Sequence, residues 1–251
     1  MISQKANMTR AIDFKGPLYL PSHIDINFKW LYDKDEVKIK IIRELLGSLK
    51  VDMIEQGYHQ PDDPARYGCP DGTWYDEWGV RWINDGHGGR VFGHPLEAGY
   101  DRLPLLSIPE AGNITWFADA MKQFKANPDK FHIGMVWHTL FERLWMLRGF
   151  NNMLMDPYIN TKDFLYLRDL VVDFSLAQID VFGDLNADAI FFSDDWGSQR
   201  TLLMKPDDWR TFYKPAYTKL FRRVRDRGMK VIMHLCGNVS AILPDLLEMG
   251  L

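Results

Sequence analysis

The fold is decided by two stretches of similar design, ADAIFFSDDWG at residues 187–197 and MKVIMHLCGN at residues 229–238. Each is a short apolar run that ends in polar residues, and a helical pattern separates the two. Short apolar runs that alternate with helices are typical of a parallel sheet covered by helices. We therefore predict strands at residues 189–192 and 229–233, with their carboxyl ends at one edge of a sheet.

The same alternation extends outward from these stretches. An apolar run at residues 131–136 predicts a third strand, and Val51–Ile54 is a candidate for a fourth. The pattern predicts helices at residues 36–49, 114–125, 140–155, 163–185, 206–228 and 240–249, with Thr161 as an N-cap and an interruption or new start at Pro215. Because no strand is followed by a G-x-G-x-x-G sequence, a dinucleotide-binding fold is disfavoured. We predict an α/β chain of the (β/α)8 TIM-barrel type.

An aromatic, loop-rich region precedes the regular alternation. It runs from Gly57 to Pro109 and contains several clustered Trp and Tyr residues. Loops longer than about 12–15 residues are usually functional or form a small subdomain. We therefore expect residues 1–110 to form an N-terminal extension with a helix and capping loops, integral to the same domain, and residues 111–251 to form the barrel portion. A barrel of this type takes about 250 residues. Because about 110 of the 251 residues precede the regular alternation, we expect the barrel to be incomplete at the C-terminus.

The composition is typical of a folded chain with a small net charge. Of its 251 residues, 46% are hydrophobic and 25% are charged, which excludes the composition of a disordered chain. The formal net charge of −4 gives no basic surface for nucleic acid, and no apolar stretch reaches the length of a membrane span. With only two cysteines, a disulfide framework is not expected, so we predict a cytoplasmic protein that acts on a small molecule. A homodimer is compatible with this composition.

Two adjacent carboxylates, Asp194 and Asp195, directly follow the strand predicted at residues 189–192. In parallel α/β folds, reacting groups gather at the carboxyl ends of the strands. Adjacent carboxylates repel, so at least one of them needs a proton, a cation or a hydrogen-bond donor nearby. We expect both residues to be catalytic; the alternative is a pair of turn aspartates that backbone amides stabilise.

His234 and Cys236 follow the next predicted strand in the same way. Residues at i and i+2 of an extended backbone point to the same side, so an imidazole nitrogen and a thiolate can reach one metal ion. Zinc fits these donors. The alternative is a buried thiol beside a hydrogen-bonded core histidine.

Four further residues are expected to bind substrate, and one more is a catalytic candidate. The substrate-binding candidates are Arg148, Gln199, Arg200 and Asn238. The planar guanidinium of Arg148 suits a carboxylate or phosphate, although a structural helix arginine is the alternative. Asp76, in an acidic pair among aromatic residues, is the additional candidate for acid–base chemistry, with a turn carboxylate as its alternative.

The combined motifs resemble the uroporphyrinogen decarboxylase superfamily, and within it the cobalamin-dependent methyltransferase branch. The resemblance rests on the segments at residues 193–200, 209–215 and 234–239, together with 147–152 and 75–80. It implies a (β/α)8 barrel with its site at the carboxyl-terminal mouth. In this branch a zinc ion, held by a His-x-Cys pair and a later Cys, binds a thiol such as coenzyme M, which then takes a methyl group from a corrinoid.

Carried onto this chain, the resemblance implies that His234 and Cys236 are zinc ligands, that Asp194 and Asp195 orient ligands or substrate, and that the corrinoid is carried by a partner protein. No Cys follows Cys236, so the third ligand is expected beyond Leu251. The leading hypothesis is a zinc-dependent methyltransferase that moves a methyl group between a corrinoid and a thiol-type acceptor. The alternatives are a carboxy-lyase that acts on a tetrapyrrole, and an inactive fragment or binding subunit that another chain completes.

Overall fold

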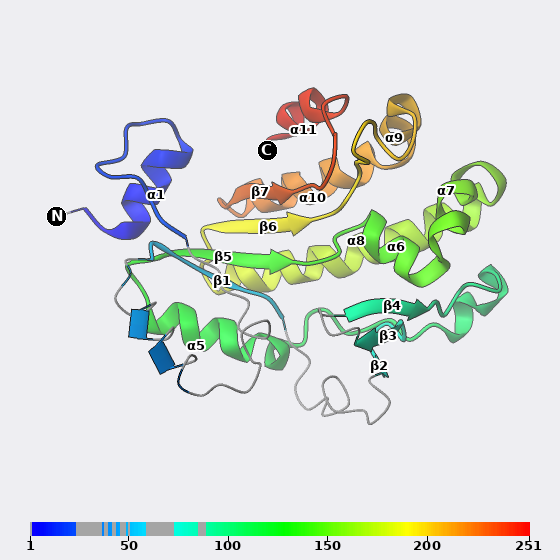
Figure 1. The fold of residues 1–251 in the computed structure, drawn as a ribbon, viewed down its shortest axis with the longest axis horizontal. Coiled ribbons are helices and arrows are strands. Elements are labelled where there is room, and N and C mark those ends of the chain that lie inside the picture. The colour runs from blue at the N-terminus through cyan, green and yellow to red at the C-terminus, as the bar shows by residue number, and fades with distance from the viewer. Residues whose placement is uncertain are drawn as a thin grey trace.

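A computed structural model of the protein describes residues 2–23, 37, 40, 41, 44, 45, 49, 51–58, 73–84 and 89–251. Its centre is a parallel sheet with the strand order β1-β5-β6-β7 (Figure 1). The strands are β1 (Met53–Gln56), β5 (Phe131–Val136), β6 (Ala189–Ser193) and β7 (Lys230–His234). Because all four strands are parallel, their carboxyl ends lie at one edge of the sheet.

Helices cover one face of this sheet and its carboxyl edge. Helices α5 (Ala118–Ala126), α8 (Thr161–Asp184) and α10 (Lys214–Asp226) contact β1, β5 and β7, respectively. Beyond the carboxyl ends of the strands lie α6 (Phe141–Arg148), α7 (Phe150–Ile159) and α9 (Pro206–Phe212) (Figure 1). Helix α11 (Leu243–Met249) follows β7, and the 3-10 helix η2 (Ile114–Phe117) leads into α5. The apolar core between these helices and the sheet supports the loops that carry the polar residues.

A small antiparallel sheet precedes the main sheet in sequence. It contains β2 (Thr73–Tyr75), β3 (Arg81–Asn84) and β4 (Gly89–Gly93), in that spatial order. The indole rings of Trp74 and Trp82 stack across β2 and β3 at a centroid distance of 6.1 Å. A 3-10 helix, η1 (Tyr100–Leu105), follows. Part of the aromatic, loop-rich region therefore forms a three-stranded antiparallel sheet.

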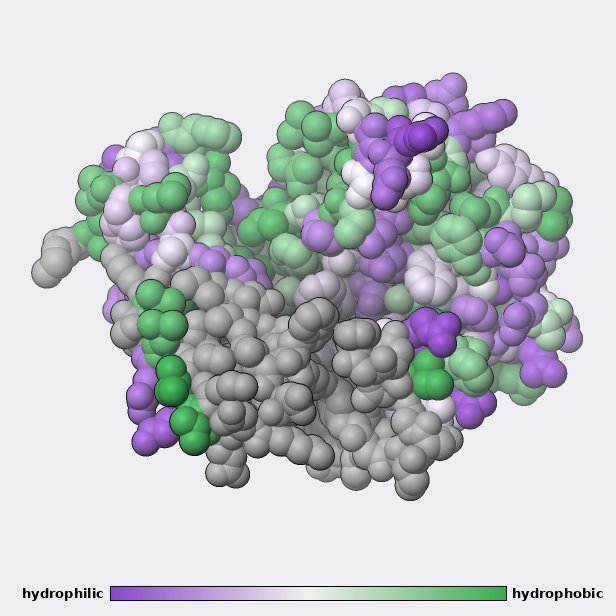
Figure 2. Space-filling model, viewed as in Figure 1, coloured by the Kyte–Doolittle hydropathy of each residue, from purple (hydrophilic) through white to green (hydrophobic). Residues whose placement is uncertain are grey.

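The opposite face of the main sheet carries a second, smaller apolar cluster. Met8 and Ile12 of α1 (Gln4–Ile12) pack against Phe131, Ile133 and Ala189. Next to this contact, Phe191 and Ile232 are only partly buried. Figure 2 shows that the surface is hollowed between α1 and α11, with apolar side chains along the hollow. Helix α1 therefore covers the amino-terminal half of this face, and in the carboxyl half the described side chains of Phe191 and Ile232 stay partly exposed.

Most of the predicted elements are confirmed, and two details are wrong. The helix predicted at residues 140–155 is broken at Gly149, whose φ of 87° lies outside helical geometry, so α6 and α7 are separate helices. Thr161 lies inside α8 and Asn160 occupies the N-cap position. The helix predicted at residues 36–49 lies largely outside the described residues.

The α/β fold and the parallel sheet are confirmed, but the described residues form an open sheet and not a closed barrel. Strand β1 is at one edge and β7 at the other. No helix in the described ranges has both the length and the apolar character needed to cross a membrane.

Gly134, in the middle of β5, determines how closely α8 approaches the sheet. A Cβ atom at this position would lie 2.4 Å from Cγ of the Phe182 ring in α8. Phe182 is fully buried and packs edge-on against Phe117 at 5.1 Å, so its ring has no space to move away.

We therefore predict that Gly134→Ala lowers the free energy of unfolding by about 1–3 kcal/mol, the usual cost of overpacking a core. Gly112→Ala is the matched control, because a Cβ atom there meets nothing within 4 Å. Urea denaturation of both variants tests the prediction, and equal midpoints would contradict it.

Candidate metal centre

The ends of β6 and β7 place two polar loops side by side. Ser193 pairs with His234 at the last position of the β6–β7 register. One residue further on, the amide of Asp194 donates a hydrogen bond to the carbonyl oxygen of His234 at 3.2 Å. The loops that follow therefore start from the same edge of the sheet, as expected for adjacent parallel strands.

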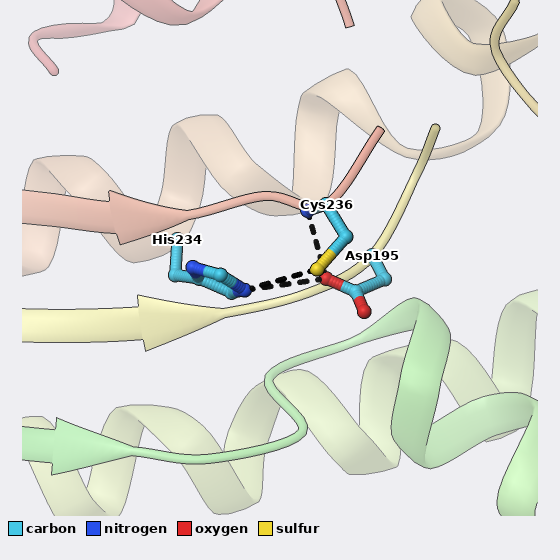
Figure 3. A group of neighbouring side chains, drawn as sticks. All are labelled: Asp195, His234 and Cys236. Carbon is cyan, nitrogen blue, oxygen red and sulfur yellow. Dashed lines mark hydrogen bonds and ion pairs between the residues drawn. The ribbon is translucent and has the colours of Figure 1, made fainter. Parts of the chain in front are cut away.

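Three side chains from these loops come together (Figure 3). Nε2 of His234 lies 3.2 Å from Sγ of Cys236 and 3.8 Å from Oδ1 of Asp195. One ligand atom from each residue lies within 4.8 Å of the other two. The side chains of His234 and Asp195 are 49% and 40% exposed, so the group is open to solvent. The predicted neighbours His234 and Cys236 thus have Asp195 as a third donor.

Two glycines hold the loops together. A Cβ atom at Gly197 would lie 2.6 Å from backbone atoms of Cys236, Gly237 and Asn238, and one at Gly237 would lie 2.3 Å from the backbone of Gly197. This close approach of the two loops permits two hydrogen bonds between their backbones. The Gly197 amide donates to the Cys236 carbonyl oxygen at 3.1 Å, and the Asn238 amide donates to the Ser198 carbonyl oxygen at 2.8 Å. Only residues without a Cβ atom allow this approach.

The three donors fit zinc in both type and spacing. Zinc binds imidazole nitrogen and carboxylate oxygen at about 2.0–2.2 Å and thiolate sulfur at about 2.3 Å, so tetrahedral ligand atoms lie roughly 3.3–3.6 Å apart. The distances from His234 to Cys236 and Asp195 are 3.2 and 3.8 Å, close to this range. The Cys236 amide also donates to Oδ1 of Asp195 at 2.9 Å, which orients the carboxylate. Although Cys236 is an exposed residue, what burial it has, followed by hydrogen bonding with Asp195 and the charge of Asp195, raises the pKa of its thiol. A bound cation would reverse this effect by favouring the thiolate.

Asp194 is placed differently from Asp195, although the two are adjacent. Its carboxylate is fully buried and accepts hydrogen bonds from the amides of Phe141 and Glu142 at 2.8 and 2.7 Å. The Tyr217 hydroxyl also donates to it. Burial raises the pKa of Asp194 to about 6, while these donors favour its ionised form. Asp194 therefore anchors the first turn of α6, whereas Asp195 belongs to the open group. The predicted catalytic role of Asp194 stays a prediction.

Glu142 is a neighbour of the site that the sequence analysis missed. It lies in the first turn of α6, directly after the β5 loop, and its amide is bonded to Asp194. Burial and the charges of Asp194 and Asp195 raise the pKa of Glu142 to about 8. The charge of Glu142 also contributes to the raised pKa of Cys236. Its position directly after the loop that follows a barrel-type strand was the available signal.

Asp76 belongs to a separate, buried network. Its Oδ2 accepts a hydrogen bond from Arg143 at 2.6 Å, and its Oδ1 accepts from the amides of Trp78 and Val80. A second carboxylate, Glu77, lies 3.5 Å from the same guanidinium. These contacts attach the hairpin region to α6. Asp76 is thus not brought together with Asp195, His234 and Cys236, and its catalytic role stays a prediction.

The guanidinium of Arg148 also makes buried hydrogen bonds. Its guanidinium donates to Asp156 at 2.8 Å and to the carbonyl oxygens of Leu96 and Glu97 at 2.9 and 2.8 Å. The guanidinium carbon lies 4.9 Å from the centroid of the Tyr100 ring. These contacts are those of a structural arginine, the alternative given above, and substrate binding by Arg148 stays a prediction.

The remaining candidates lie on the two loops. Gln199 and Arg200 are exposed after β6. The side-chain amide of Asn238 donates to the Arg200 carbonyl at 3.0 Å, so Asn238 joins the loop after β7 to the loop after β6. Substrate binding by these residues stays a prediction.

With this arrangement established, comparison with known proteins identifies the family. The family model described as uroporphyrinogen decarboxylase matches residues 80–251, which is more than half of the chain. The chain belongs to the uroporphyrinogen decarboxylase family. The match includes β5, β6 and β7, and with them all three residues of the candidate metal centre.

Solved structures show the same fold. Thirteen of their chains match, among them a methyltransferase from Methanosarcina mazei with a TM-score of 0.69 and 18% sequence identity. The match covers 100% of this chain and 74% of that one. At this identity the likeness concerns the fold. No curated protein matches the chain in sequence.

We predict that Asp194→Ala and Asp195→Ala have different consequences, although the residues are neighbours. Asp194→Ala leaves two amides and the Tyr217 hydroxyl without their acceptor, which we expect to lower the free energy of unfolding by about 3 kcal/mol or more. Asp195→Ala, at an open position, is expected to cost less than about 1 kcal/mol. Urea denaturation measures both, and equal losses would contradict the separation of roles.

We also predict that Gly197→Ala weakens zinc binding by about tenfold or more, because the loops must separate to admit the methyl group. The sheet itself is expected to remain folded. Competition with a chromophoric chelator measures the affinity, with Gly112→Ala as the control. If the Gly197→Ala protein bound zinc as tightly as the wild type, the close approach of the loops would have no role in forming the site.

Proposed function

We propose that the protein is a zinc-dependent methyltransferase that moves a methyl group between a corrinoid and a thiol-type acceptor. The observation that carries the proposal is the group of one imidazole, one thiol and one carboxylate at the carboxyl ends of β6 and β7. Membership of the uroporphyrinogen decarboxylase family and the fold shared with the methyltransferase from Methanosarcina mazei support it.

The chemistry follows from the donor set. His234, Cys236 and Asp195 would hold the ion, leaving a fourth position for the acceptor, as in catalytic zinc sites with three protein ligands. Zinc bound there lowers the pKa of a thiol, so that a nucleophilic thiolate is available at neutral pH. The Cys236 amide orients the Asp195 carboxylate, and the fixed approach of Gly197 to Gly237 keeps the two loops in register.

The exposure of the group suits a large methyl donor. His234 and Asp195 are about half and two fifths exposed, respectively, so a reactant can approach without rearrangement of the core. A corrinoid is a large planar group, and an open sheet edge can accommodate it. We propose a corrinoid-carrying partner protein as the source of the methyl group.

A second candidate is decarboxylation of a tetrapyrrole. The family match favours it, because the family model is named for such an enzyme. Two arginines near the sheet edge, Arg143 and Arg148, are already paired with Asp76 and Asp156, which leaves them unavailable for substrate carboxylates. The donor group of His234 and Cys236 also has no role in a reaction of this kind. The first proposal therefore accounts for more of the structure.

We predict that zinc-loaded protein transfers the methyl group of methylcobalamin to 2-mercaptoethanesulfonate and that Cys236→Ser lowers both zinc content and rate by at least about tenfold. Ser240→Ala, an exposed substitution in the same loop, is the control and is expected to leave both unchanged. Metal analysis and the absorbance change of the corrinoid measure the two effects. Undiminished methyl transfer by metal-free protein would refute the proposal, and decarboxylation of uroporphyrinogen by that protein would support the second candidate.

A further inference from the structure

Apolar side chains of the sheet lead up to the candidate metal centre. Phe191 of β6 and Ile232 of β7 are register partners, and both belong to the apolar cluster on the face of the sheet that α1 partly covers. His234 follows Ile232 by two residues on β7, so its side chain points to the same face. These apolar side chains and the donor group therefore share one face of the sheet.

Trp137 extends this apolar surface at the carboxyl end of β5. Its ring packs against the ring of Phe191 at a centroid distance of 5.9 Å and an interplanar angle of 60°. Close to Cδ1 of the indole lies Gly57, which has no side chain to cover it. Trp137 is 48% exposed, the most of any tryptophan in the described part of the chain. We call Trp137, Phe191 and Ile232 the apolar shelf.

The apolar shelf and the donor group together have the composition of a small-molecule site. Such sites are lined mostly by apolar and aromatic side chains, with a few polar groups that fix the orientation of the ligand. Aromatic side chains bind a second ring better than their buried area alone accounts for. The three side chains of the shelf carry no charge, so a sulfonate or carboxylate placed on them would lose hydration without gaining a partner there. The shelf therefore favours a neutral, aromatic group.

The spacing along β7 indicates the size of this group. A strand rises about 3.3 Å per residue, so Ile232 lies roughly 7 Å before His234. A thiol whose sulfur is bound to an ion at His234 would therefore place a carbon body of benzyl size over the shelf. The exposed side of the donor group, where His234 and Asp195 are 49% and 40% exposed, stays free for the methyl donor.

We propose that the methyl acceptor is a neutral thiol with an aromatic body, and that Trp137 determines this specificity. The inference rests on the zinc-dependent methyl transfer proposed above and names the class of its acceptor. The donor group would hold the ion that binds the sulfur, and the apolar shelf would hold the rest of the molecule. 2-Mercaptoethanesulfonate, with a charged body and no ring, is then an acceptor that binds weakly.

The test compares two primary thiols, benzyl mercaptan and 2-mercaptoethanol, on zinc-loaded wild type, Trp137→Ala and Trp137→Phe. Calorimetric titration measures the dissociation constants, and the corrinoid absorbance with methylcobalamin measures KM and kcat. On the wild type we expect benzyl mercaptan to bind about tenfold more tightly than 2-mercaptoethanol. Trp137→Ala is expected to remove this preference while the affinity for 2-mercaptoethanol stays within about twofold, and Trp137→Phe, which keeps a ring, to retain most of it.

Tyr166→Ala is the matched control. It removes an exposed aromatic side chain from α8, which packs on the other face of the sheet, and is expected to change neither affinity. If Trp137→Ala did not fold, Trp137→Leu would replace it, because leucine keeps apolar volume without a ring. We expect Trp137→Leu to weaken the binding of benzyl mercaptan alone, by at least about threefold.

The outcomes separate this inference from the proposed function. Equal affinity of the wild type for the two thiols, or a preference that survives the loss of the Trp137 ring, would overturn the role of the shelf even if methyl transfer occurred. Tight binding of benzyl mercaptan that depends on Trp137, without methyl transfer, would overturn the proposed function and leave the thiol site standing. A wild type that bound neither thiol would overturn both.

Discussion

The buried carboxylate of Asp194 is the interaction on which the arrangement of this sheet edge depends. It accepts two amides from the first turn of α6 and a hydroxyl from α10, while its own amide bonds to the end of β7. Tyr217 in turn accepts a hydrogen bond from the Trp196 indole at 2.7 Å. The side chain of Asp194 thus joins the helices that follow β5 and β6, and its backbone joins them to the end of β7. In a buried environment such a network is strong when every donor has its acceptor, and costly when one is removed. The carboxylate also stabilises the amino terminus of α6, where negative charge is favourable.

The two adjacent aspartates show how one strand end can serve structure and chemistry together. Successive side chains of an extended backbone point to opposite sides. Asp194 turns into the protein and meets α6 and α10, and Asp195 turns to the open side, where His234 and Cys236 lie. The backbone contact between Gly197 and Gly237 then sets the distance between the loops. A rigid, buried support beneath an exposed donor group is what a metal centre requires, because the ligands must keep their geometry while one position stays accessible.

Much of this arrangement could be predicted from the sequence, and the limits have physical causes. Strand positions followed from apolar runs, and the spacing of His234 and Cys236 directly predicted that they would be neighbours. The burial of Asp194 and the exposure of Asp195 could not be predicted, because they depend on which helix packs against the strand end. Arg148 and Asp76 were candidates by residue type, yet the partners that occupy them, Asp156 and Arg143, lie on other parts of the fold. Glu142 was missed because its place beside Asp194 arises from the anchoring of α6. Closure of the sheet into a barrel is a tertiary property that local periodicity does not determine.

X-ray absorption spectroscopy of the zinc-loaded protein tests the central claim most directly. The claim is that one imidazole, one thiolate and one carboxylate from adjacent strand ends bind the same ion. It predicts a single sulfur neighbour at about 2.3 Å together with nitrogen and oxygen neighbours at about 2.0–2.2 Å. The sulfur signal should be lost in Cys236→Ser. A zinc ion surrounded only by oxygen and nitrogen, with the same spectrum in wild type and Cys236→Ser, would contradict the claim.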